Sequence, residues 1–208
     1  MKSNPNAKGV VLESHGLFTW ANDAKTCYET TLAIINKAIE WLDRKTAGKA
    51  AFGGAVTQSL AAAERRAIAA RLMPEIRGLI GKEERKLGHF DDQDAVLEFV
   101  NAKELRPLAA LGTSCPDHFL RTKIRPLVVN FDPAKPDINA VVAGLEGALE
   151  AYRADYKRYY EACKHDNSPK MRDPNPVIFL IPGVGMLSFA RDKATARIAG
   201  EFYVNAIN

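Results

Sequence analysis

Apolar and polar residues alternate along the chain in a pattern that predicts short strands followed by longer helices. Branched and aromatic residues dominate 9–13 and 17–20, which favours two strands joined by a tight turn. A helix is expected from Asn22 or Asp23, either of which can cap it, to about Lys45. Its apolar positions recur at intervals of three and four and form one face: Tyr28, Leu32, Ile35, Ile39 and Leu42. The first predicted unit is therefore a strand, a turn, a strand and a helix.

The remaining pattern predicts the same kinds of element with more interruptions. Residues 47–57 are small and glycine-rich, as in a linker or a long crossing loop. A helix is expected from about Ser59 to Leu72, ended or kinked near Met73 by Pro74, and the charged segment after it is interpreted as helix and loop. The later elements are expected to be a strand at 127–131, a helix at about 139–164, a strand at 177–181, and a short strand and helix ending near 206.

Tyrosines lie on the apolar stripe of the long helix expected at about 139–164. They are Tyr152, Tyr156 and Tyr160, and they continue a stripe that begins with Leu145 and Leu149. Such a stripe at helical spacing is typical of core or interface packing. We therefore interpret it as packing and not as a cofactor site.

The end of the chain repeats the pattern of its beginning. When Gly16 is aligned with Gly185, an offset of 169 residues, the apolar positions of both strand pairs coincide. The residues that are identical at this offset are Ala21 and Ala190, Asp23 and Asp192, Thr26 and Thr195, and Asn36 and Asn205. We interpret the repeat as a duplication of one supersecondary unit. The copies differ in chemistry, because His15 precedes the first glycine and Val184 the second, and only an imidazole can bind a metal or move a proton.

The composition is that of an ordinary globular protein. The chain has 208 residues, of which 47% are hydrophobic and 26% charged, and this excludes a disordered or fibrous chain. Its net charge of +4 arises from charges of both signs that alternate, as in 82–86, which is typical of a solvated face and not of a nucleic-acid stripe. The three cysteines are widely spaced without a C-x-x-C pair, which argues against a disulfide framework or a zinc ribbon and fits a reducing cytosol.

No segment predicts a membrane span or a secretory signal. No run approaches the ~20 apolar residues that a membrane-spanning helix needs. The N-terminal residues lack the apolar core of a signal peptide. We therefore expect a cytoplasmic protein with neither a membrane nor a nucleic acid as its partner.

The segment Gly183-Val184-Gly185 superficially resembles the G-x-G-x-x-G fingerprint of dinucleotide-binding folds. Ser188 replaces the third glycine, and residues 186–189 are expected to form a strand where the fingerprint needs a helix. The acidic residue expected ~20 positions further on would fall about where the chain ends. NAD is therefore not expected to bind this chain.

Residues 10–21, V-V-L-E-S-H-G-L-F-T-W-A, resemble the last strand pair and helix of the class II aldolase/adducin family. The strings H-G-L-F-T-W at 15–20 and A-I-E-W-L at 38–42 are closer still to one branch, the bifunctional rhamnulose-1-phosphate aldolase/short-chain dehydrogenase proteins. Residues 111–123 and 181–186 resemble the same branch. The resemblance thus covers nearly the whole chain.

The resemblance implies a zinc-dependent reaction in which His15 takes part. In this family the histidine of the His-Gly turn is the third histidine ligand of a catalytic zinc, together with an upstream His-x-His pair, and an upstream glutamate acts as acid and base. The zinc stabilises the enediolate of a ketose phosphate, here rhamnulose 1-phosphate, during its reversible cleavage to dihydroxyacetone phosphate and lactaldehyde. Only His15 has a counterpart in this chain, and the other groups would lie before Met1. Because a catalytic zinc takes about three protein ligands, the resemblance implies an incomplete enzyme that is inactive alone.

Asp117 and His118 are weaker candidates for metal ligands. They are expected to lie with Cys115 in a short loop, and His118 precedes Val184 by 66 residues, a distance compatible with the family's spacing between the His-x-His pair and the His-Gly turn. No His-x-His pair is present, however, and the third ligand position is Val184. A lost or altered site is the favoured interpretation. Alternatively, Asp117 and His118 hold the segment 121–123 through hydrogen bonds.

The fold implied by the resemblance is α/β, with a central, mostly antiparallel sheet flanked by helices as in class II aldolases. Residues 1–47 would be the closing unit of a first aldolase-like lobe, 48–57 a linker and 58–208 a second, degenerate lobe. The expected function is a part of a zinc-dependent sugar-phosphate aldolase that forms homo-oligomers. It would be fused to a short-chain dehydrogenase whose NAD site lies outside this chain. The alternative is a non-catalytic packing or oligomerisation module, like the adducin-like members of the family.

Overall fold

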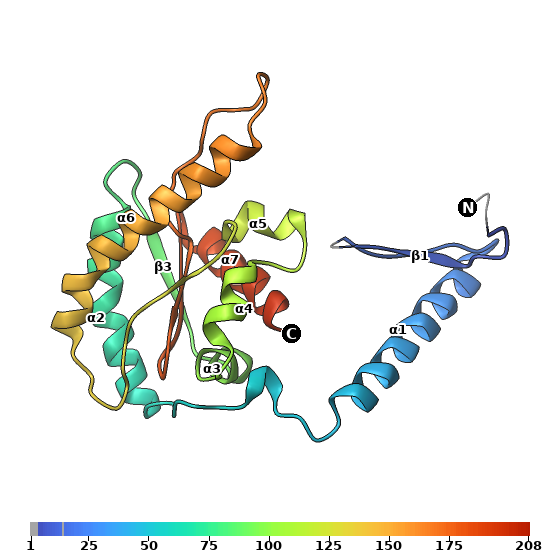
Figure 1. The fold of residues 1–208 in the computed structure, drawn as a ribbon, viewed down its shortest axis with the longest axis horizontal. Helices are drawn as coiled ribbons and strands as arrows, with labels where there is room; N and C mark the ends of the chain where they lie inside the picture. Colours follow the sequence, from blue (N-terminus) through green and yellow to red (C-terminus); the bar gives the residue numbers. More distant parts are fainter. Residues whose placement is uncertain (1–3, 14) are drawn as a thin grey trace. The chain divides into compact units, whose positions relative to one another are not determined.

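A computed structural model describes residues 4–13 and 15–208 (Figure 1). Ser14, in the first expected turn, lies outside the described residues. The chain divides into two compact units. The first comprises the residues up to Ala50 together with Ser114–Pro116, and the second comprises Ala51–Thr113 and Asp117–Asn208. Each unit is described by itself.

The first unit is a β-hairpin followed by one helix. Strands β1 (Gly9–Leu12) and β2 (Gly16–Thr19) pair antiparallel, and α1 spans Ala24–Thr46. The carboxylate of Asp23 accepts a hydrogen bond of 2.8 Å from the backbone N–H of Thr26 and so caps α1. The strands and the helix therefore form where the apolar pattern predicts them.

The second unit contains the other helices, except for Pro116 at the start of α5, and a four-stranded sheet. Its elements in chain order are a short 3-10 turn η1 (Ala51–Gly53), α2 (Ala62–Ile80), β3 (Leu87–Asp91), α3 (Asp94–Val100), α4 (Leu105–Leu111), α5 (Pro116–Thr122), β4 (Leu127–Val128), α6 (Ile138–Cys163), β5 (Ile178–Ile181), β6 (Gly185–Ala190) and α7 (Lys193–Ile207). The strand order in the sheet is β3-β6-β5-β4. β6 runs antiparallel to both of its neighbours, and β4 runs parallel to β5. The prediction of an α/β fold with a mostly antiparallel sheet is confirmed.

Strand β5 is buried on both faces and joins two apolar cores. Phe179 and Ile181 pack with residues of α2 and α6, whereas Ile178 and Leu180 pack with residues of α3, α4 and α7. Alternate side chains of a strand point to opposite faces, so one short strand serves both cores. Figure 1 shows the result as a sheet with α2 and α6 on one side and α3, α4 and α7 on the other.

The two hairpins have the same register at the offset of 169 residues. Leu12 pairs with Gly16 in the first hairpin and Ile181 with Gly185 in the second, and the other three pairs of each hairpin follow the same offset. Gly16 and Gly185 have φ angles of 142° and 137°, which side chains with a Cβ rarely adopt. Asp192 caps α7 through Thr195, as Asp23 caps α1 through Thr26. This local identity supports the interpretation of a duplicated unit.

The copies differ in burial. Leu180 and Val184 are 0% exposed, whereas Val11, the equivalent of Leu180, is 70% exposed. No residue of α1 is fully buried. The same local structure therefore forms the core of the second unit and a mostly exposed surface in the first.

Two local predictions are wrong. Helix α2 does not end near Met73 but continues past Pro74 to Ile80, because Leu72, Ile76 and Ile80 on one face are buried in a core that includes residues of the sheet. Residues Leu87–Asp91, interpreted as part of a helix and loop, form the edge strand β3. Pairing with β6 determines this strand, which has no strong local strand signal. None of the described helices has both the length and the apolar character that crossing a lipid bilayer requires.

Because β5 serves both cores, we expect Leu180→Ala to lower the free energy of unfolding of the second unit by about 2–5 kcal/mol. The matched control is Val11→Ala, the equivalent change in the exposed hairpin, with an expected effect within about 0.5 kcal/mol. Both tryptophans, Trp20 and Trp41, belong to the first unit. Urea unfolding followed by tryptophan fluorescence therefore reports on that unit, and the near-ultraviolet dichroism of tyrosine reports mainly on the other. Equal effects of the two substitutions would contradict the difference in burial.

Candidate functional site

His15 lies in the turn of the first hairpin with its side chain exposed. Its backbone N–H donates to the carbonyl of Leu12 at 3.1 Å, which closes the turn. Its ring stacks on Phe18 with 5.7 Å between ring centroids and 28° between planes. The hairpin register thus fixes where the imidazole is presented, and one aromatic contact orients it. This geometry suits a ligand or proton carrier that meets a partner from outside the unit.

Asp117 and His118 lie in helix α5 and not in a loop as the sequence suggested. Asp117 is exposed, and the ring of half-buried His118 packs edge-on against Phe202 at 4.9 Å between centroids. Neighbouring residues of a helix point about 100° apart, so these two side chains do not converge on one point. The following segment is held partly by a bond to the backbone of the helix, since Thr122 Oγ1 donates to the carbonyl of His118 at 3.2 Å. The pair therefore lacks the arrangement of a metal site.

The described residues do not fit a catalytic zinc by themselves. Among residues 4–13 and 15–208, no three side chains of His, Cys, Asp or Glu lie close enough together to hold a metal ion. A zinc site takes about three protein ligands, and His15 offers one. A metal at His15 would need ligands supplied from elsewhere.

The turn Gly183-Val184-Gly185 has a structural role. It joins β5 to β6 and does not open a helix, so it lacks the geometry of the dinucleotide fingerprint. Val184 is fully buried, and the N–H of Gly183 donates to Asn101 Oδ1 at 2.8 Å. A Cβ at Gly183 would lie 2.6 Å from Pro133 Cβ, which explains the glycine. The position equivalent to His15 is therefore a packed turn.

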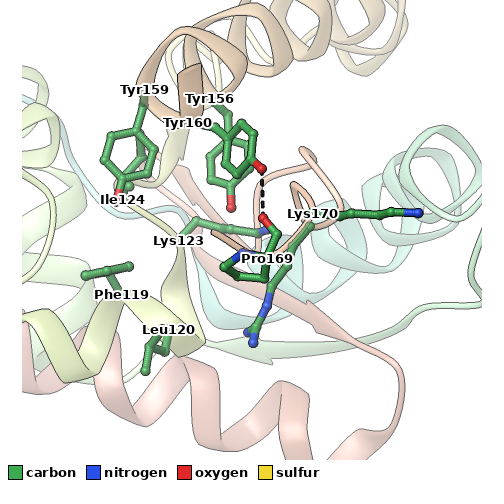
Figure 2. Close-up of a pocket in the computed structure, with 10 residues that line it drawn as sticks. Phe119, Leu120, Lys123, Ile124, Tyr156, Tyr159, Tyr160, Pro169 and Lys170 are labelled. Atoms are coloured by element: carbon green, nitrogen blue, oxygen red, sulfur yellow. Dashed lines mark hydrogen bonds between the residues drawn. The ribbon is translucent and has the colours of Figure 1, made fainter. Parts of the chain in front are cut away.

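A cavity of about 230 Å³ opens in the second unit, lined by residues from three segments (Figure 2). Helix α6 contributes Tyr156, Tyr159 and Tyr160. The end of α5 and the residues after it contribute Phe119, Leu120, Lys123 and Ile124, and the loop before β5 contributes Pro169, Lys170 and Arg172. Aromatic and cationic side chains thus dominate the lining.

Lys123 is the most perturbed cation at this cavity. Its backbone has the left-handed φ of 67°, directly after α5, and its N–H donates to the carbonyl of Phe119 at 2.8 Å. Its Nζ donates to the backbone carbonyl of Asp173 and lies 4.4 Å from the centroid of the Tyr156 ring. The pKa of Lys123 is lowered to about 8, mainly by burial and to a smaller extent by the charges of Lys86 and Arg172, with Asp173 partly opposing the shift.

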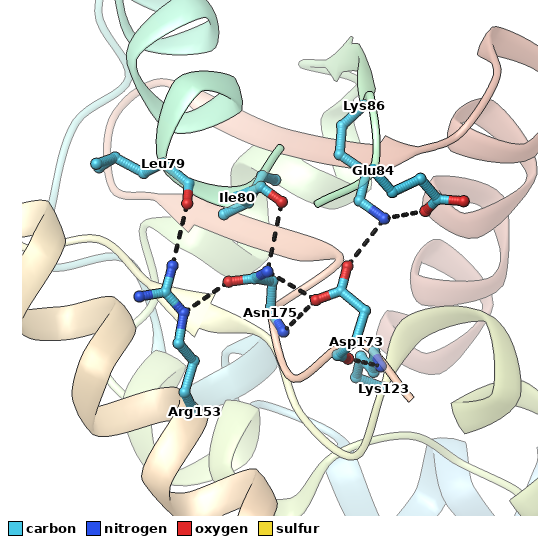
Figure 3. A network of polar contacts seen from close by, with 8 residues as sticks. All are labelled: Leu79, Ile80, Glu84, Lys86, Lys123, Arg153, Asp173 and Asn175. Carbon is cyan, nitrogen blue, oxygen red and sulfur yellow. Dashed lines mark hydrogen bonds and ion pairs between the residues drawn. The ribbon is translucent and has the colours of Figure 1, made fainter. Parts of the chain in front are cut away.

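A polar network behind Lys123 fixes the loop before β5 (Figure 3). The carboxylate of Asp173 accepts from Lys86 at 2.9 Å and from Asn175 Nδ2 at 2.6 Å. Asn175 in turn accepts from Arg153 Nε of α6 at 2.8 Å. Burial alone would raise the pKa of the Asp173 carboxyl, but the bonds from Lys86 and the Asn175 backbone outweigh it and lower the pKa. The Asp173 carboxylate is therefore already engaged, while its carbonyl holds Lys123.

Sequence reasoning missed this cavity. The tyrosine stripe of α6 was interpreted as packing, and that is correct for Tyr152, which is buried and donates to the carbonyl of Arg125 at 2.7 Å. Tyr156 and Tyr160 line the cavity, and Tyr156 also packs against the core of α2 and α6. The available signal was a tyrosine-rich helix followed by a proline loop that carries Lys170 and Arg172.

Comparison with known proteins places the chain in a family. Residues 67–208 match the family model described as "Aldolase class II, second domain". The chain is 33% identical over 205 residues to a protein of Bacillus subtilis (strain 168) named "Uncharacterized oxidoreductase YuxG". This alignment covers 99% of the chain but only 30% of the relative. No solved structure matches the chain.

The lowered pKa of Lys123 predicts a pH dependence of stability. The pKa is about 8 in the folded state and near 10.5 in the unfolded chain, so between these values the unfolded chain binds the proton more tightly. Stability of the second unit therefore gains a contribution that rises with pH through this window, and Lys123→Met removes it. Urea unfolding at a series of pH values measures the effect. Lys157→Met, at an exposed lysine of α6, is the control, and parallel curves for both variants would refute the assignment.

Proposed function

Since the chain belongs to the family of the class II aldolase second domain, we propose that it is part of a longer sugar-phosphate aldolase and that its two units have different roles. The first unit presents His15 to a zinc site completed by residues outside this chain. The second unit is a copy without the histidine and serves as a scaffold. The observation that carries this proposal is the identical register of the two hairpins, with exposed His15 in one and buried Val184 in the other.

The length of the relative supports a longer protein. The matched region is only 30% of that relative, and the relative is named an oxidoreductase. We extend to this chain the proposal of a fused short-chain dehydrogenase whose NAD site lies in another domain. Rhamnulose 1-phosphate is the proposed substrate on the strength of the motifs at 15–20 and 38–42.

The geometry of the first hairpin supports a role for His15 at a site shared with other residues. The described residues of this chain do not complete a zinc site, so we assign no catalytic step to the chain alone. The first unit contributes the position of the His15 side chain. A two-strand register, a glycine with positive φ after His15, and the ring of Phe18 hold the imidazole at the tip of the hairpin.

A second candidate, a packing or oligomerisation module, is favoured by one face of α1. Tyr28, Leu32, Ile35, Ile39 and Leu42 form an apolar stripe, and each is 40–65% exposed. At the positions equivalent to Tyr28 and Leu32, α7 carries Arg197 and Glu201, which form a solvent-exposed ion pair. Tyr28 and Leu32 therefore lie outside the face with which α7 packs on its hairpin, and the exposed stripe suits contact with another helix.

We expect His15→Ala in the full-length protein to abolish tight zinc binding and to reduce retro-aldol cleavage of rhamnulose 1-phosphate by about 10²-fold or more. A metal site that loses one of about three ligands cannot retain its ion. His165→Ala, at an exposed histidine in the loop after α6, is the matched control. Zinc content and aldolase activity are measured on the same preparations. Unchanged values in His15→Ala would refute the proposed role of His15.

The packing role is tested by charging the stripe. We expect the double substitution Leu32→Glu and Ile39→Glu to lower the molecular mass of the full-length protein in solution, since buried carboxylates would disrupt a helix interface. Asn36→Glu, at an exposed position of α1 outside the stripe, is the control. Light scattering coupled to gel filtration measures the mass. An unchanged mass together with unchanged thermal stability would exclude the packing role of this face.

A further inference from the structure

The cavity beside Lys123 has the features of a binding site. It has no part in the aldolase function proposed above. It is built entirely from residues of the second unit, and neither His15 nor the turn at Val184 lines it. Its volume of about 230 Å³ is below the ~300–1,000 Å³ typical of sites for drug-sized ligands. The size therefore suits a ligand with a single ring.

The charge at the cavity is positive. Lys123, Lys170 and Arg172 line it, and none of the ten described lining residues carries a carboxylate. The nearby carboxylate of Asp173 is taken up by Lys86 and Asn175. An ammonium group has three hydrogens to donate, and for Lys123 the contacts described are one carbonyl and one ring face. An anion would satisfy this half-buried cation further.

The walls of the cavity are flat and aromatic. Tyr156 and Tyr159 lie with their ring centroids 6.0 Å apart, and Phe119 faces the cavity from the other side (Figure 2). The hydroxyl of Tyr160 donates to the carbonyl of Pro169 at 2.7 Å, which fixes this ring against the loop. Rings held in this way offer stacking and edge contacts to a planar ligand.

We propose that this cavity binds a small aromatic anion, an aryl phosphate or aryl carboxylate of one ring, with the anionic group against Lys123 and the ring among the tyrosines. Arg172, exposed on the loop, adds a second cation at the rim. Binding is non-covalent, and it is independent of the aldolase chemistry proposed above.

Binding is coupled to the charge of Lys123. The groups that face its Nζ are Asp173 and Arg172 of the loop, Lys86 before β3 and Tyr156 of α6. A bound anion stabilises the protonated amine, so the affinity falls as the pH rises through about 8, the pKa of Lys123 in the chain without ligand. The second pKa of a phosphate monoester lies near 6, so an aryl phosphate is already a dianion there and does not itself cause the change.

The test is calorimetric titration of the 208-residue chain with phenyl phosphate, and with inorganic phosphate and phenol as its two halves. We expect phenyl phosphate to bind about tenfold or more tightly than either half, because it alone satisfies both the cation and the rings. Lys123→Met should weaken it by about tenfold or more, whereas Lys157→Met should leave it unchanged. Lys123→Arg, which keeps the charge, should retain most of the affinity below pH 8 and lose its pH dependence.

Several outcomes would overturn the proposal. They are no saturable binding of phenyl phosphate up to about 10 mM, equal affinity for inorganic phosphate, or an affinity that Lys123→Met does not change. Ribose 5-phosphate binding as tightly as phenyl phosphate would show a site for sugar phosphates and not for aromatic anions. If Lys123→Met fails to fold by circular dichroism, Arg172→Gln at the exposed rim replaces it, with a smaller loss expected. Failure here leaves the zinc content of His15→Ala unaffected, so the two proposals fail separately.

Discussion

The two-sided burial of the hairpin β5–β6 is the constraint on which the second unit depends. Its strands separate the core of α2 and α6 from that of α3, α4 and α7, and its turn is buried as well. A buried turn must satisfy its backbone, and Asn101 does so by accepting from Gly183 while donating to Ser59 at 2.7 Å. An imidazole at Val184 would need a polar partner that this packing does not provide. The burial that stabilises the second unit therefore excludes the chemistry that His15 can offer in the first.

The first unit has the same local structure as the β5–β6 hairpin and its helix, but it is not buried in a core. Its register, its positive-φ glycine and its helix cap match those of the second hairpin, yet Val11 is 70% exposed. The unit presents two features that its copy lacks, namely His15 and the apolar stripe of α1. His15 and the stripe can each function only in contact with residues outside the unit. The two roles that fit the first unit are therefore a part of an aldolase site and a packing module.

The cavity beside Lys123 arises where three segments far apart in the sequence meet. The network of Lys86, Asp173 and Asn175 fixes the loop, and the loop holds Lys123 against Tyr156 in surroundings that disfavour its charge. A half-buried cation whose charge is only partly compensated costs stability. Such groups concentrate at binding sites, where a ligand supplies the missing partner.

The sequence by itself determined the elements that depend on neighbouring residues: the hairpin at 9–19, a helix cap at Asn22 or Asp23, the long helices and the repeat at an offset of 169. Periodicity, turn glycines and caps act within a few residues, so they are visible in the chain. Only the tertiary structure decided that β3 is a strand and that α2 continues through Pro74, because both follow from packing against β6 and the sheet. It also decided that one stripe of α6 is partly core and partly cavity wall. The segments that meet Tyr156 and Tyr160 lie elsewhere in the sequence, and no local pattern carries that contact.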